Sequence, residues 1–109
     1  MSVKYAEPAT TQAVLQPLDD SPAGGSVTAH QYRTIGHGRF DQVFHCPGVN
    51  ANSSVVASIT EVDDRNRPFL GGADTQVLNV VPRDDEIVLL RAHVGWSSPL
   101  HLRVTLMAT

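Results

Sequence analysis

The stretch that decides the fold is LHLRVTLM, residues 100–107. Four aliphatic residues of this stretch alternate with three polar residues and a methionine: Leu100, Leu102, Val104 and Leu106 against His101, Arg103, Thr105 and Met107. Successive side chains of a β-strand point to opposite faces, so a period of two places all four aliphatic side chains on one face. The stretch therefore predicts a strand that buries one face in a core.

Five further segments before this strand are rich in β-branched and aromatic residues and are bounded by turn residues. They cover residues 26–35, 39–46, 53–62, 75–81 and 87–96. No segment shows a helical period, and loops of two to about twelve residues separate the strands. The sequence predicts an all-β fold, an antiparallel β-sandwich or small barrel of about six strands or more. In segment 53–62, apolar residues fall on both faces, and we expect both faces to be partly covered.

Residues 1–25 differ from the rest of the chain and predict an extended N-terminal arm, which leaves residues 26–109 as the β-sandwich domain. Prolines at three positions exclude a helix or a central strand through this segment, and a Gly-Gly pair ends it. Its apolar residues are widely scattered, as in a peptide that lies on a surface: Val3, Tyr5, Val14, Leu15 and Leu18. We expect these five residues to form an interface with a partner; a terminus without a role is the alternative.

Composition narrows the classes of function. The chain has 109 residues, of which 17% are charged, and a net charge of -3. Its basic residues are scattered, so we expect no nucleic-acid binding. The single cysteine, Cys46, excludes an intramolecular disulfide. No signal peptide and no apolar run of membrane-spanning length is visible, so we expect synthesis in the cytoplasm and no membrane association.

Residue types with metal-binding or catalytic chemistry are present but are not arranged as a site. In segment 61–66 the acidic residues are interrupted by Arg65, which would repel a cation. The five histidines lack zinc-site spacing, and we expect His93 and His101 to meet across paired strands as a structural contact. Cys46 lacks a helix N-terminus that would activate it and is expected to fill the core. The sequence predicts no catalytic residue, no metal site and no cofactor.

Two apolar features lie outside the predicted strands. Phe69 and Leu70 form an apolar pair in the otherwise polar loop 63–74, which favours either an interface anchor or a loop that folds back to bury them. Trp96 ends a strand beside Ser97 and Ser98. It is a possible sugar-stacking platform, and a lid on the core is the alternative.

Two longer segments carry a resemblance. Residues 43–63 read VFHCPGVNANSSVVASITEVD, and residues 76–96 read QVLNVVPRDDEIVLLRAHVGW. The Pro-Gly-Val step at residues 47–49, the Ser-Val-Val-Ala-Ser strand at 54–58 and the Pro-Arg-Asp-Asp turn at 82–85 resemble small β-sandwich modules of bacteriophage virion proteins. Head decoration (cement) proteins and terminal domains of tail fibres contain such modules. The resemblance covers about half of the chain and excludes the arm.

This resemblance implies a non-enzymatic virion structural protein. We expect a capsid decoration protein that binds and stabilises the assembled head through its sandwich and its arm. The implied partners are the major capsid protein or other virion proteins, the implied location is the virion, and the implied oligomer is a homotrimer. The alternative is a receptor-binding or carbohydrate-binding module of a tail tip or fibre. A small enzyme is a third hypothesis, which no group of residues supports.

Overall fold

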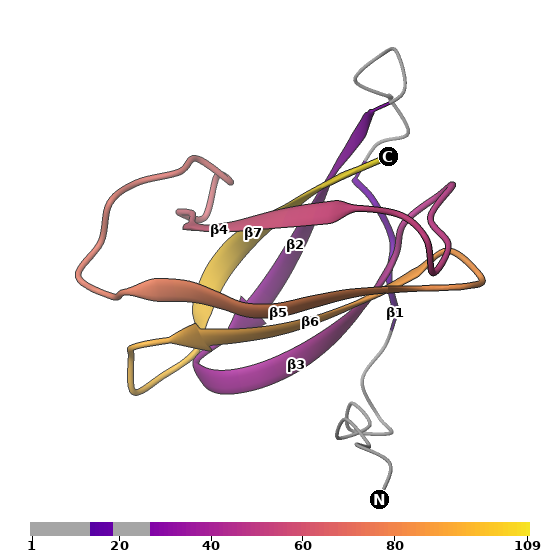
Figure 1. The fold of residues 1–109 in the computed structure, drawn as a ribbon. Helices are drawn as coiled ribbons and strands as arrows, with labels where there is room; N and C mark the ends of the chain where they lie inside the picture. Colours follow the sequence, from indigo (N-terminus) through magenta and orange to yellow (C-terminus); the bar gives the residue numbers. More distant parts are fainter. Residues whose placement is uncertain (1–13, 19–26) are drawn as a thin grey trace, which may run out of the picture.

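Seven strands make up the part of the chain described by the computed structural model, residues 14–18 and 27–109 (Figure 1). In chain order they are β1 (Val14–Leu15), β2 (Thr28–Gly36), β3 (Gly38–His45), β4 (Val55–Glu61), β5 (Thr75–Arg83), β6 (Ile87–Val94) and β7 (Leu100–Ala108). They form a four-stranded sheet in the order β1-β3-β6-β5 and a three-stranded sheet in the order β2-β7-β4. The fold is all-β, in agreement with the sequence prediction, and its form is that of a sandwich.

The decisive stretch becomes β7, the central strand of the smaller sheet. It pairs antiparallel with β2 on one side and β4 on the other. Leu102, Val104 and Leu106 are fully buried, whereas Met107 is exposed. The inward row of β6 is buried in the same way, from Val88 to Val94. The alternation read from the sequence is thus the alternation between the core and the outer face.

An aromatic pair lies in this core. Tyr32 of β2 and Phe44 of β3 are both fully buried, with ring centroids 4.7 Å apart and an edge-to-face angle of 70°. The Tyr32 hydroxyl donates a hydrogen bond to the His45 carbonyl oxygen at 2.7 Å. Burial, joined by the nearby Cys46 thiol, raises the pKa of the Tyr32 phenol far above its usual value, so it remains a donor. The pair therefore joins the two sheets without leaving a polar atom unsatisfied.

Three strand-level expectations need correction. β5 runs through Pro82 to Arg83 instead of ending at residue 81, because β5 is an edge strand and a proline there removes no pairing inside the sheet. The outer face of β4 is covered only near Thr60, which is partly buried, since Ser58 is exposed and Val56 is 63% exposed. His93 and His101 do not meet, because β6 and β7 belong to different sheets and both side chains lie on the outer faces.

Part of the predicted arm belongs to the sandwich. β1 pairs in parallel with β3, with Val14 beside Val43 and Leu15 beside Phe44. Leu15 packs against the core, and the Leu18 amide donates to the Gln31 carbonyl of β2 at 2.7 Å. Residues 14–18 thus connect the two sheets along one edge. Val3 and Tyr5 of the predicted arm interface lie outside the described residues.

The two ends of the sandwich differ. One end, the turn end, contains residues 46–54 and 84–86 and lies to the right in Figure 1. The other, the loop end, contains residues 62–74 and 95–99 and lies to the left. Phe69, Leu70 and Trp96 are all at the loop end, so the fold gathers three residues that the sequence presents as separate candidates.

Candidate protein-interaction surfaces

The turn end is held together by hydrogen bonds between two segments of the resemblance. The Glu86 carboxylate accepts the Gly48 amide at 2.8 Å and contacts His45 Nε2 at 3.1 Å. The Ala51 amide donates to Asp84 Oδ1 at 3.1 Å. The Pro-Gly-Val step and the Pro-Arg-Asp-Asp turn therefore lie against each other and stabilise this end.

Glu86 occupies an unusual backbone conformation to make these contacts. Asp85 and Glu86 have φ values of 68° and 62°, a left-handed pair that suits the tight turn between two antiparallel strands. Glutamate is rare in this region, and the conformation is unfavourable for it. The hydrogen bond from Gly48, followed by the contact with His45, lowers the pKa of the Glu86 carboxyl. The ionised side chain thus stabilises the turn in which it sits.

The residues considered as catalytic or metal-binding candidates have structural roles. Cys46 is fully buried, and burial raises the pKa of its thiol, so the thiol remains protonated. Asp63 Oδ1 accepts the amides of Arg65 and Arg67, each at 2.9 Å, which closes the loop that begins at Asp63. These hydrogen bonds lower the pKa of the Asp63 carboxyl. In the described part of the chain, no three residues of metal-binding type lie close enough to hold an ion.

An apolar row crosses the outer face of the four-stranded sheet. The register places Val14 beside Val43, Val43 beside Leu89, and Leu89 beside Val81. The chain neighbours Phe44, Val88 and Leu90 are buried in the core, so Val43 and Leu89 point outward. Val14 and Val81, at the two edges, are each 43% exposed. We call these four residues the apolar row.

A compensated ion pair lies beside the apolar row. Arg91 Nε and Nη2 contact Asp41 Oδ1 and Oδ2 at 2.8 and 3.1 Å, across the next outward position of β6 and β3. The Arg91 guanidinium lowers the pKa of the Asp41 carboxyl, chiefly through this hydrogen bond. Because the two charges cancel, the centre of this sheet face combines an apolar strip with a neutral polar strip, a composition suited to burial against another protein.

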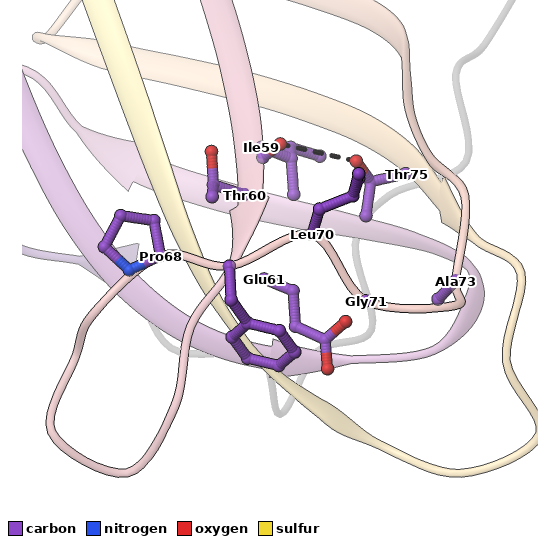
Figure 2. A pocket seen from close by; sticks show the side chains of 9 residues that line it. Ile59, Thr60, Glu61, Pro68, Leu70, Gly71, Ala73 and Thr75 are labelled. Atoms are coloured by element: carbon purple, nitrogen blue, oxygen red, sulfur yellow. Dashed lines mark hydrogen bonds between the residues drawn. The ribbon is translucent and has the colours of Figure 1, made fainter.

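The loop end carries a second surface, an open pocket of about 390 Å³ (Figure 2). Its lining residues come from the end of β4, the following loop and the start of β5: Ile59, Thr60, Glu61, Pro68, Phe69, Leu70, Gly71, Ala73 and Thr75. Leu70 is 100% exposed and Phe69 is 46% exposed. The loop therefore does not fold back to bury them.

Trp96 flanks the same end. It is 47% exposed, so it does not act as a closed lid on the core. A Cβ atom on Gly72 would lie 3.4 Å from Cζ3 of the indole, which places the Trp96 ring against the loop that forms the pocket. The Gly95 amide donates to the Asp74 carbonyl at 2.8 Å and fixes the two loops together. Phe69, Leu70 and Trp96 are thus presented by one linked pair of loops.

Sequence reasoning missed the apolar row and the position of Glu61. The row forms only when four strands pair, including β1. Its sequence signal is that pairs of adjacent residues in β3, β5 and β6 are both apolar, such as Leu89-Leu90. The sequence presents Glu61 only as a member of the acidic segment 61–66. Its signal is its place in the alternation Val55, Ala57, Ile59, which puts it on the core side of β4.

Comparison of the chain with protein-family models, with curated proteins and with solved structures finds no match. In the segments 14–18 and 27–109, no helix has the length and apolar character needed to cross a membrane.

Proposed function

We propose that this protein is a non-enzymatic virion structural protein, a capsid decoration protein that binds and stabilises the assembled phage head. The apolar row carries this proposal, because an apolar strip that is exposed at both edges of a sheet and partly exposed at its centre is typical of a surface that another protein covers. The proposal that the partner is a virion protein rests on a resemblance to virion modules. This resemblance lies in the Pro-Gly-Val, Ser-Val-Val-Ala-Ser and Pro-Arg-Asp-Asp segments.

The mechanism is mass action. A protein that binds the assembled shell and not its free subunits stabilises the shell by its binding free energy. The major capsid protein is the proposed partner. A homotrimer is the proposed form, because three linked copies that each bind weakly give high overall affinity through avidity. The predicted N-terminal arm, residues 1–25, would add further contacts through backbone hydrogen bonds or an added strand at an exposed sheet edge of the partner.

The test is to follow the protein in a lysate of the host that produces it. Density-gradient centrifugation separates heads, tails and free protein, and quantitative mass spectrometry counts the protein in each fraction. We expect many copies per head and few or none with tails. Absence from every particle fraction would overturn the virion proposal.

The half-exposed Trp96 favours a second candidate function, a receptor-binding or carbohydrate-binding module of a tail tip or fibre. An indole beside exposed Ser97 and Ser98 offers a stacking face next to hydroxyl groups. This function predicts a few copies per particle in the tail fraction, and glycan binding that Trp96→Ala abolishes. A glycan array without a signal would exclude the sugar-binding form.

A further inference from the structure

We propose that the pocket at the loop end binds a cationic side chain, Arg or Lys, which a protein partner presents between apolar residues, with Glu61 as the counter-ion. This inference rests on the proposed function only in that the partner is a protein. It deepens that function by naming the chemistry that the partner must present.

Glu61 has an uncommon position for a carboxylate. Its cross-strand neighbour on β7 is Leu102, which is fully buried, so Glu61 lies on the core side of the sheet. The preceding residue on this side, Ile59, packs against the core. A charge on this side is unfavourable unless it is solvated or paired. Figure 2 shows that the pocket provides the opening, with the Glu61 carboxylate directed toward Gly71.

No cation of the described chain satisfies this carboxylate. Within residues 14–18 and 27–109 the Glu61 carboxylate makes neither a hydrogen bond nor an ion pair. Arg67 contacts Asp63 through Nε at 3.2 Å, and Arg103 donates to the Asn66 carbonyl oxygen. Arg67 and, through Nη2, Arg103 therefore bind other groups, and Arg103, whose Nε has no hydrogen bond, lies on the outer face of β7. The Glu61 charge on the core side is left to complement a cation from outside.

The walls of the pocket suit the rest of an Arg or Lys side chain. The methylene groups of these side chains cover apolar surface while the charged head reaches a counter-ion. Phe69 offers a half-exposed ring for contact with a guanidinium, and the fully exposed Leu70 can contact apolar residues beside the cation. A neutral or acidic segment would desolvate Glu61 without pairing it, so the pocket selects for positive charge.

The first experiment uses the full chain and a defined probe. ¹H–¹⁵N spectra are recorded during titration with the blocked tripeptide Leu-Arg-Leu and with the same peptide containing citrulline, the uncharged analogue of arginine. We expect the amide signals of Glu61, Leu70, Gly71 and Thr75 to shift with the arginine peptide, and affinity to fall about tenfold or more with citrulline. Equal binding of the two peptides would overturn the proposal.

Two variants locate the counter-ion. Glu61→Gln keeps the size of the side chain and should weaken binding of the arginine peptide about as much as citrulline does. Asp64→Asn removes the same charge from an exposed position of the same loop and should leave binding unchanged. Unchanged binding by Glu61→Gln, or an equal loss in Asp64→Asn, would contradict the role of Glu61. If Glu61→Gln does not fold, Leu70→Ser is used instead, because a fully exposed side chain tolerates this change. Leu70→Ser should weaken peptide binding. Unchanged binding would contradict the proposal that the peptide binds in the pocket.

Particle binding separates this inference from the proposed function. If the wild-type protein is found on heads and Glu61→Gln is lost from them, both proposals are supported. If both proteins are found on heads in equal amount, the pocket inference fails and the decoration role stands. If the wild-type protein is absent from particles, the decoration role fails, and the peptide titration alone decides on the pocket. Tighter peptide binding by Lys4→Gln would show that the chain's own arm fills the pocket, and would overturn an external partner.

Discussion

At the scale of single residues, Glu86 shows how a locally unfavourable conformation is compensated. Its left-handed backbone is retained because its carboxylate accepts the Gly48 amide and contacts His45. Both contacts favour the ionised form, which is why the pKa of the carboxyl is lowered. The turn end therefore depends on charge as well as on backbone pairing.

This dependence predicts how stability changes with pH. A carboxyl with a lowered pKa in the folded state stabilises the fold above its ordinary pKa of about 4.3, and this contribution is lost as the pH falls through the lowered value. We expect Glu86→Gln to be less stable than the wild type at pH 7 and to lose less stability on acidification. Urea denaturation at neutral and acidic pH measures both effects. Asp85→Asn is the control. An equally reduced dependence of the free energy of unfolding on pH in this variant would contradict the assignment to Glu86.

The buried Tyr32 hydroxyl gives a second prediction at this scale. Its hydrogen bond to the His45 carbonyl is made inside the core, where an unpaired carbonyl is costly. We expect Tyr32→Phe to lower the free energy of unfolding by about 1–2 kcal/mol without changing the fold. Chemical denaturation measures the loss. A change below about 0.5 kcal/mol would show that the bond contributes little.

At the scale of elements, β1 shows that the N-terminal segment is part of the sandwich. Its two adjacent residues have opposite roles, since Leu15 packs on the core while Val14 extends the apolar row. We expect Leu15→Ala to lower the free energy of unfolding by about 1–2 kcal/mol, less than a fully buried leucine would. Val14→Ala should change it by less than about 0.5 kcal/mol. Equal losses in the two variants would show that β1 does not contribute to the core.

The sequence predicts the strands better than their arrangement. Strict alternation in residues 100–107 and turn residues such as Pro47-Gly48 locate strands, because these signals are local. Pairing is not local, which is why His93 and His101 were expected to meet although β6 and β7 lie in different sheets. The same limit hid the apolar row, whose members come from four strands. Phe69, Leu70 and Trp96 were found as single residues, and only the fold brings them to one end.

At the scale of the whole molecule, the sandwich has a closed turn end, an open loop end and an apolar row on one sheet. A homotrimer is the form that we propose for it. Light scattering on a sizing column at micromolar concentration should give three times the mass of one chain. A monomer would leave assembly on the head possible and would move the tail-tip alternative ahead in the order of tests.

The central claim is that the apolar row binds a partner on the phage head, and head binding by Val81→Asp tests it most directly. A charge at this exposed edge position should leave the fold intact, with stability changed by less than about 1 kcal/mol, because Val81 is not part of the core. The same charge would be buried without a partner at the interface, so binding should be lost. Heads incubated with each protein and recovered by centrifugation should retain the wild type and not the variant. Equal retention of a folded Val81→Asp variant would contradict the account.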